Sequence, residues 1–298
     1  MAVIFKKRFL SGWVLVLSLF LLAGCGGVAA DDPLAVVTIQ NKGSDTIVNL
    51  ALAWAEAYQQ VNPQVRVAVT GGGSGTGITA LINGTVDIAN ASRQIKDEEL
   101  QAAQQNGIEV RELVIARDAI AIVVHPDNPV ETLTLQQISD IYSGKITNWL
   151  DVGGEDRPIV LLSRETNSGT HVYFLEEVIR LGRAEDKTLF SPDTLLLPSS
   201  EGISTEVRQN PNAIGYDGLG YVTPDMKTIQ VGLAPEGPFW SPTAETVNAG
   251  QYPIARELYM YLPTNVSDAI GTYLEWILSP EAQRIVLDLG FIPVAATE

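Results

Sequence analysis

VLLSRETNSGTHVYFLEE, residues 160–177, is the stretch from which both the fold and the chemistry can be predicted. Val160 to Leu162 predict a buried strand, which a polar turn joins to a helix beginning at Ser168 or Thr170. The first turn of a helix carries unpaired N–H groups and the positive end of the macrodipole, and here two hydroxyls and the upstream Arg164 accompany them. The stretch therefore predicts an oxyanion receptor, although an ordinary capped helix with a solvated arginine explains it equally well in isolation.

The same pattern occurs at two other places in the chain. Residues 42–60, KGSDTIVNLALAWAEAYQQ, place Ser44, Asp45 and Thr46 ahead of an apolar-periodic helix. Residues 70–82, TGGGSGTGITALI, place Ser74 at a helix start behind glycines that allow close backbone approach to a ligand. Three such turns are better explained by one shared anion than by three unrelated helix caps.

Length and charge limit the possible functions. The 298 residues predict one large or two ordinary domains, and a hydrophobic content of 46% is enough for a substantial core. A formal charge of −16 argues against nucleic acid or an anionic membrane surface as a partner. An anion site in this chain must therefore work through local dipoles and one or two arginines.

The N-terminus has the features of a secreted lipoprotein. Basic Lys6 to Arg8 precede an apolar run, and the run ends in small residues before Cys25, the only cysteine. This resembles a lipobox, so residues 1–24 are predicted to be a signal peptide and Cys25 the lipidated first residue of the mature chain. Residues 25–33 then read as a flexible tether. An uncleaved membrane anchor is the alternative.

Strands and helices alternate along the remaining chain, which predicts an α/β fold with a mostly parallel sheet covered by helices on both faces. Ligands bind such sheets outside the carboxyl ends of the strands, where the Gly/Ser/Thr turns fall. The pattern predicts strands at 36–40, 65–70, 86–89, 110–115, 120–124, 213–215 and 258–262, helices at 47–60, 78–83, 97–106, 203–209, 266–278 and 280–289, and loops with short strands over 224–253.

Six motifs occur in register over nearly all of the predicted mature chain: GSDT, GGGSGTGI, DIANASRQI, DIYSGKITNW, SRETNSGT and NAIGYDGLGY. Together they resemble the phosphate-binding lipoproteins of bacterial ABC phosphate importers. The resemblance implies a type II periplasmic-binding-protein fold, in which two α/β lobes joined by two crossover strands clamp the anion in a cleft. It also implies that residues 34–117 form the first part of lobe one, 118–256 lobe two, and 257–298 the return to lobe one.

The resemblance implies an anion site made by both lobes. From lobe one it takes Ser44, Thr46, Ser74, Ser92 and Arg93, and from lobe two Arg164, Ser168, Gly169 and Thr170. The chemistry of these residues agrees, because the arginine fork suits two phosphate oxygens while hydroxyls and N–H groups fix the tetrahedron without a metal or cofactor. The implied partners are inorganic phosphate and the membrane subunits of an ABC permease, with the chain as a monomer held by its lipid at the outer face of the cytoplasmic membrane or in the periplasm.

The chain departs from part of that family at Ser92, where some members have an aspartate that accepts the proton of hydrogen phosphate and repels sulfate. We expect Asp45 to be the discriminating acceptor here, with Glu165 as the second candidate. Plain helix capping is the alternative role of Asp45. Asp118 and Asp217 could position loops, but solvated loop carboxylates are commoner.

Other classes of protein fit the sequence less well. The glycine-rich turn at 71–77 lacks the Gly-Lys-Ser/Thr ending of a P-loop, and neither Ser74 nor Ser168 lies in a Gly-x-Ser-x-Gly elbow, so a phosphate-ester hydrolase is a remote alternative. His125 and His171 stand apart without a Cys/His cluster, and no metal site is predicted. A binder of sulfate, molybdate or tungstate on the same fold remains the nearest alternative.

Overall fold

The computed structural model describes residues 36–294. The predicted signal peptide, the lipidation site Cys25 and the tether lie outside the described residues. Within the described part, no helix is both long and apolar enough to cross a membrane.

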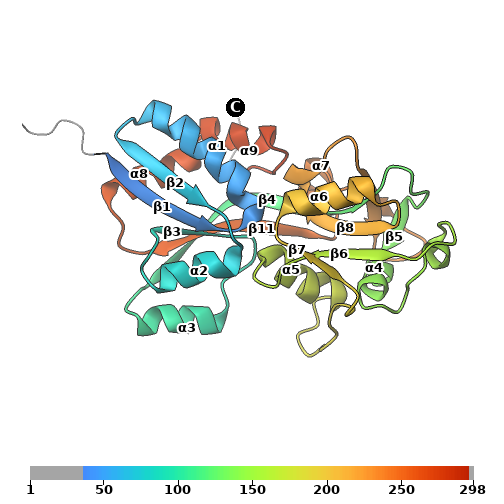
Figure 1. Ribbon diagram of the computed structural model, residues 1–298. Coiled ribbons are helices and arrows are strands. Elements are labelled where there is room, and N and C mark those ends of the chain that lie inside the picture. The colour runs from blue at the N-terminus through green and yellow to red at the C-terminus, as the bar shows by residue number, and fades with distance from the viewer. Residues whose placement is uncertain (1–35, 295–298) are drawn as a thin grey trace, which may run out of the picture. The chain divides into compact units, whose positions relative to one another are not determined.

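The described chain is a mixed α/β structure whose elements follow the predicted alternation (Figure 1). The strands are β1 Val37–Gly43, β2 Val65–Thr70, β3 Ile88–Ala91, β4 Val110–Val124, β5 Thr132–Thr134, β6 Val160–Arg164, β7 Leu195–Leu197, β8 Ala213–Gly218, β9 Lys227–Gly232, β10 Phe239–Trp240 and β11 Ala255–Pro263. The α-helices are α1 Asp45–Val61, α2 Ser74–Ile82, α3 Asp97–Gln105, α4 Leu135–Tyr142, α5 Gly169–Tyr173, α6 Ser200–Gln209, α7 Ala244–Asn248, α8 Asp268–Ile277 and α9 Pro280–Asp288. A π-helix, Phe174–Ile179, continues α5, and 3-10 turns occupy Trp149–Val152 and Leu219–Tyr221.

The first part of the sheet has the strand order β2-β1-β3-β11-β4. Its first three strands are parallel, as expected for strands joined through the crossover helices α1 and α2, whereas β11 is antiparallel to both neighbours. Helices α1, α8 and α9 cover one face and α2 and α3 the other (Figure 1). The core under α1 includes fully buried Trp54, whose indole N–H donates to Ala282 O at 2.8 Å and so ties α1 to α9.

The second part continues the sheet as β4-β8-β6-β7, with β9 also pairing β4. Its main core is aromatic: the Phe174 and Tyr216 rings are stacked with centroids 3.6 Å apart, and Tyr142 meets both rings edge-on. Strand β9 lies in the segment 224–253, which the sequence predicted to be loops with short strands.

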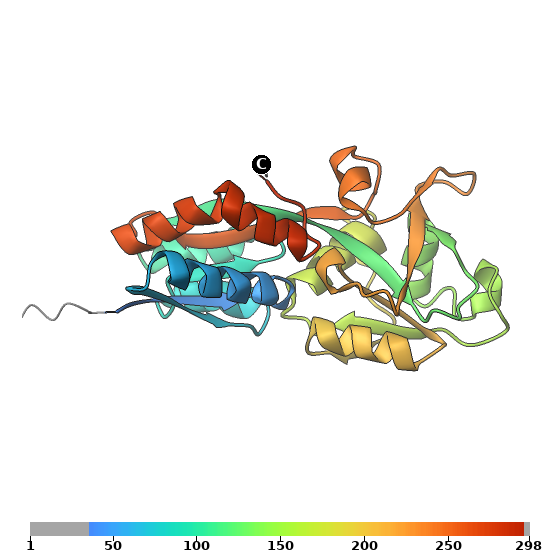
Figure 2. The same cartoon turned by 90° about the horizontal axis from the view of Figure 1, so that it is seen from above.

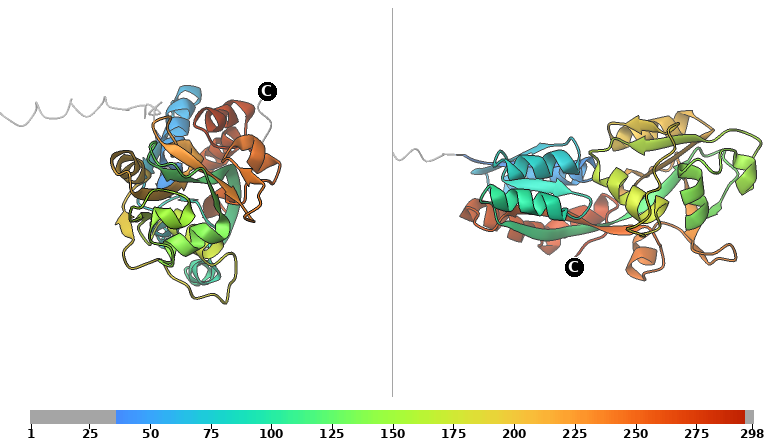
Figure 3. Two further views of the ribbon diagram at one scale, coloured as in Figure 1. Left: turned by 90° about the vertical axis from the view of Figure 1, so that its right-hand side faces the viewer. Right: turned by 90° about the horizontal axis from the view of Figure 1, so that it is seen from below.

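Strand β4 belongs to both parts of the sheet, and β11 pairs along its first half. Figures 2 and 3 show them running side by side between the two groups of helices, and they pair over nine positions from Ala255↔Ala119 to Pro263↔Val110. The sequence predicted two separate strands at 110–115 and 120–124, which is wrong, because a single strand runs through Arg117 and Asp118. These charges interrupt the apolar pattern, yet Arg117 pairs through its backbone with Ile292 and Asp118 is ion-paired with Arg256.

Candidate functional site

Hydroxyls from three separate turns meet at the ends of β1 and β3. Ser44, the N-cap of α1, donates from Oγ to Ser92 Oγ at 2.9 Å. Ser74, the first residue of α2, lies 3.3 Å from Ser92 Oγ through its own Oγ, and the Ser92 N–H donates to Ser74 Oγ at 3.1 Å. All three serines are at most 2% exposed. Two of the turns predicted to share one ligand, those of Ser44 and Ser74, therefore bring their hydroxyls together with that of Ser92.

Residues from the other part of the sheet complete this group. The backbone of Gly169, the first residue of α5, packs so closely on the serines that an added Cβ would overlap Ser74 Oγ and lie 2.6 Å from Ser92 Oγ. Thr46 Oγ1 and Thr170 Oγ1 are 2.9 Å apart although 124 residues separate them in sequence. We call Ser44, Thr46, Ser74, Ser92, Gly169 and Thr170 the hydroxyl cluster. Ser168 caps α5 beside it, because its Oγ accepts from the Thr170 N–H at 3.2 Å.

Arg164 lies next to the cluster on the Asp45 side and is 1% exposed. Its Nη2 donates to Asp45 Oδ2 at 2.7 Å and to Pro198 O at 3.0 Å, and its Nη1 donates to Ser200 Oγ at 2.9 Å. A guanidinium has five N–H donors, and Nε has no partner among residues 36–294. Arg164 therefore ties α1 to β6 and still keeps N–H groups for a ligand.

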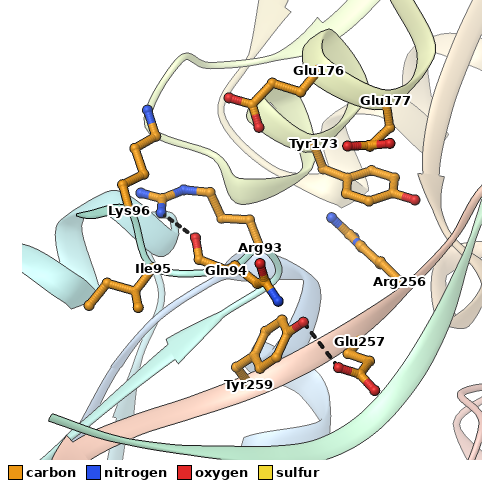
Figure 4. A pocket seen from close by; sticks show the side chains of 10 residues that line it. All are labelled: Arg93, Gln94, Ile95, Lys96, Tyr173, Glu176, Glu177, Arg256, Glu257 and Tyr259. Carbon is orange, nitrogen blue, oxygen red and sulfur yellow. Dashed lines mark hydrogen bonds between the residues drawn. The ribbon is translucent and has the colours of Figure 1, made fainter. Parts of the chain in front are cut away.

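Arg93 points away from the cluster. Its Nη atoms form a two-pronged ion pair with Glu99 at 2.7 and 2.8 Å, and Nη1 also donates to Gln94 O. It lines a separate cavity of about 340 Å³ that also includes Lys96, Tyr173 and Glu176 (Figure 4). The described contacts thus bring every predicted anion-binding residue to the cluster or its rim except Arg93.

Arg256, which the sequence did not predict as part of the site, borders both the cluster and this cavity. It is 7% exposed, lies under the Tyr173 ring at 5.6 Å from the centroid, and donates from Nη2 to Thr170 Oγ1 at 3.0 Å (Figure 4). Its charge is matched by Asp118, whose Oδ2 lies 2.9 Å from Nη2. The sequence contains a signal for such a buried arginine. Arg256 stands near the start of the apolar segment 254–262, and arginine is rarely buried without a partner.

Each arginine at the cluster or in the neighbouring cavity has its own carboxylate. The pairs are Arg93–Glu99, Arg164–Asp45 and Arg256–Asp118, with N–O distances of 2.7, 2.7 and 2.9 Å. The arginine charges are therefore already paired, and an anion must be held mainly by hydroxyl and N–H donors that a paired arginine supports. No group of His, Cys, Asp or Glu side chains in the described chain could hold a metal ion.

Asp118 and Asp217 are both buried, which corrects the expectation of solvated loop carboxylates. Burial raises the pKa of Asp118, although Arg256 acts in the opposite direction. Burial likewise raises the pKa of Asp217 to about 6, opposed by nearby Arg164. Asp217 Oδ1 accepts from Ser200 Oγ at 2.9 Å and from the Gly218 N–H, whereas Oδ2 has no partner in the described part of the chain.

The raised pKa of Asp217 predicts a pH-dependent stability. Because the folded protein holds this proton more tightly than the unfolded chain, the stabilisation is complete below pH 4 and is lost as pH rises through about 6. Across the range from the usual carboxyl pKa of 3.8 to about 6, the free energy of unfolding should fall by about 3 kcal/mol from this group. Asp217→Asn should remove that fall, as measured by urea unfolding between about pH 3 and 8. The exposed Asp193→Asn serves as the control, and a wild-type minus Asp217→Asn difference that stays constant with pH would contradict the prediction.

The chain matches known protein families over most of its length. A family model described as a PBP superfamily domain matches residues 29–281. The Pseudomonas aeruginosa protein named phosphate-binding protein PstS is 34% identical, with 93% of each chain covered. The Bacillus subtilis protein of the same name is 32% identical, with 85% of this chain and 79% of that protein covered.

Solved structures agree with these relatives. A putative phosphate ABC transporter substrate-binding protein from Clostridium perfringens, solved with bound phosphate, has a TM-score of 0.78 at 34% identity and covers 86% of this chain and 99% of its own. An ABC-type phosphate transport receptor from Vibrio cholerae has a TM-score of 0.69 at 31% identity, covering 85% and 99%. These similarities confirm the predicted periplasmic-binding-protein fold.

Proposed function

Because the chain belongs to the PBP superfamily, and within it to the phosphate-binding proteins of ABC phosphate transporters, we propose that it captures inorganic phosphate and delivers it to a permease. Proteins of this family bind a substrate for transport and are not enzymes. The observation that carries the proposal is the hydroxyl cluster, in which three turns of one sheet part and the start of α5 in the other meet within hydrogen-bonding distance.

The donors of the cluster suit a tetrahedral oxyanion. Ser44, Ser74, Ser92 and Thr170 can each donate a hydroxyl hydrogen, and Arg164 has an unused Nε–H. In a buried site each of these hydrogen bonds is made at low local dielectric, which strengthens it relative to water. Phosphate would replace the hydroxyl–hydroxyl bonds of the cluster with hydroxyl–phosphate bonds.

Capture would proceed by movement of two lobes about β4 and β11. In this proposal lobe one comprises residues 34–117 and 257–298, and lobe two comprises residues 118–256. The two boundaries between the lobes lie opposite one another, because Arg256 on β11 is in register with Asp118 on β4. Contacts between the two sides, such as Asp45–Arg164 and the Gly75 N–H to Asn167 O at 3.1 Å, would form on closing. Opening would expose the cluster to solvent.

The place of action follows from the same proposal. The protein would work outside the cytoplasm as a monomer, anchored by lipid on Cys25, and would present closed, phosphate-loaded lobes to the membrane subunits of the permease. Mass spectrometry of the membrane-extracted protein tests the anchor, since a lipidated Cys25 at the N-terminus supports it and an intact residue 1 contradicts it.

Calorimetry of the lipid-free chain from residue 26 onward tests the ligand. Phosphate, sulfate and molybdate are titrated separately, and we expect one phosphate site with a Kd well below about 1 mM, corresponding to more than about 4 kcal/mol. Tighter binding of sulfate or molybdate would assign the site to another oxyanion. Binding of none of the three at millimolar concentration would overturn the proposed function.

Asp45 is the proposed acceptor that separates phosphate from sulfate. Its side chain is 16% exposed and accepts from Arg164 and from the Gly72 N–H at 2.8 Å, which leaves lone pairs for a phosphate O–H. Asp45→Asn should reduce the ratio of phosphate to sulfate affinity by about 10-fold, on the basis of one lost hydrogen bond to a charged group. The second candidate, exposed Glu165, is the matched comparison as Glu165→Gln. An unchanged ratio in Asp45→Asn would clear Asp45 of this role.

A further inference from the structure

Arg256 contacts the crossover strand β4, the start of α1 and the start of α5 at once. Its Nε and Nη2 donate to Asp118 Oδ2 on β4 at 3.2 and 2.9 Å. Nη2 also lies 3.4 Å from Thr46 Oγ1 and 3.0 Å from Thr170 Oγ1. Its other terminal nitrogen, Nη1, donates to Ser92 O at 2.8 Å.

These contacts fix the direction of the threonine hydroxyls. Arginine can only donate, so the Nη2 hydrogen that is not directed at Asp118 Oδ2 is shared by Thr170 Oγ1 at 3.0 Å and, more weakly, by Thr46 Oγ1 at 3.4 Å. Both hydroxyl hydrogens are then turned away from Arg256, and one of them is used in the 2.9 Å Thr46–Thr170 bond. The other remains available as a donor. A threonine without the arginine could instead turn its hydrogen toward a backbone carbonyl.

The position of Arg256 links this orientation to the hinge. Arg256 and Asp118 are register partners on β11 and β4, and their side chains are 2% and 0% exposed. Thr46 and Thr170 come from opposite sides of the proposed cleft, so one guanidinium can contact both hydroxyls only while the two sides are together. The cation–π contact with the Tyr173 ring, 5.6 Å from Arg256 Cζ to the centroid, helps to hold the guanidinium in place (Figure 4).

We propose that Arg256 is a positioning residue that acts from the hinge: in the closed form only, it orients the Thr46 and Thr170 hydroxyls so that one donates to the other and the remaining hydroxyl hydrogen donates to the anion. This inference rests on the proposed phosphate-binding function. It assigns Arg256 a role through the threonines and not as a direct ligand of the anion. The Asp118 carboxylate balances its charge so that the arginine can remain buried in either state of the lobes.

A double-mutant cycle on phosphate affinity tests the role. Arg256→Gln alone would leave Asp118 buried and uncompensated, and Asp118→Asn alone would do the same to Arg256, so the two changes are made together and an amide pair replaces the ion pair. We expect Asp118→Asn/Arg256→Gln to bind phosphate about 10- to 100-fold more weakly than the wild type, as for loss of one or two charge-assisted hydrogen bonds. Thr170→Val should weaken phosphate binding much less when it is added to Asp118→Asn/Arg256→Gln than when it is added to a protein that keeps Arg256. Such coupling is expected for residues in contact.

Ser74→Ala provides the matched cycle, because Ser74 belongs to the same hydroxyl cluster but has no hydrogen bond to Arg256. The loss of phosphate affinity caused by Ser74→Ala should add to the loss caused by Asp118→Asn/Arg256→Gln. The role of Arg256 would be overturned if Ser74→Ala and Thr170→Val were equally coupled to Asp118→Asn/Arg256→Gln, or if the effects of Thr170→Val and Asp118→Asn/Arg256→Gln were simply additive. Failure of the wild-type chain to bind phosphate in the same titrations would instead overturn the proposed function, so the two failures are distinguishable.

Discussion

Replacement of Gly169 by alanine should weaken phosphate binding by about 100-fold or more, the equivalent of about 3 kcal/mol. A Cβ at this position would overlap Ser74 Oγ and approach Ser92 Oγ to 2.6 Å. The methyl group would therefore occupy space between the serines and α5, hold the two sides apart, and break hydrogen bonds to a charged ligand that contribute about 1.5–3 kcal/mol each. Calorimetric titration with phosphate measures the loss.

Gly202→Ala is the control for this change. Gly202 also lies in the first turn of a helix, α6, but a Cβ there would meet its nearest atoms, Leu197 Cβ and Ser199 Oγ, at an ordinary 3.6 Å. The phosphate affinity of Gly202→Ala should equal that of the wild type. If Gly169→Ala bound phosphate as tightly as Gly202→Ala, the close packing of α5 on the serines would not be part of the binding site.

Replacement of Arg164 by methionine is expected to have the second large effect. The side chain is 1% exposed and compensates Asp45 across the cleft, while Ser200 connects it to Asp217. Truncating one member of a buried charge pair typically costs about 2–5 kcal/mol in binding, so phosphate affinity should fall by about 30- to 5000-fold. The loss combines a missing donor to the anion with carboxylates left without their cation.

Arg183→Met is the control, because Arg183 forms an exposed surface pair with Asp186 on the same side of the molecule. Surface pairs of this kind contribute about 0–1 kcal/mol to stability, and phosphate affinity should not change. Circular dichroism of Arg164→Met separates lost binding from lost fold. A folded Arg164→Met protein with wild-type affinity would remove Arg164 from the site.

Much of the site could be predicted because its parts are encoded locally. A glycine-rich or Gly-Ser-Asp-Thr turn before an apolar-periodic segment specifies a helix start wherever it occurs, and α1, α2 and α5 all begin within a few residues of the predicted positions. In open α/β sheets, ligands bind outside the carboxyl ends of the strands, and this predicts that the turns gather at one edge of the sheet.

What escaped prediction depends on partners distant in sequence. Arg256 and Asp118 are 138 residues apart, and their pairing follows from the β4–β11 register, which no local pattern specifies. When the buried partner is unknown, a charged residue in an apolar strand resembles a strand end. The sequence pattern therefore predicts two strands within residues 110–124. The contacts of Arg93 depend on a partner in the same way, since the local pattern does not show that Glu99, in the first turn of α3, engages both terminal nitrogens of Arg93.

A crystal structure of the lipid-free chain grown with phosphate tests the central claim most directly. The account predicts one phosphate in the hydroxyl cluster, with Ser44, Ser74, Ser92 and Thr170 hydroxyls from both sides of the cleft within about 3.2 Å of its oxygens. Phosphate bound elsewhere, such as in the cavity beside Lys96, with the cluster hydroxyls still bonded only to one another, would contradict it.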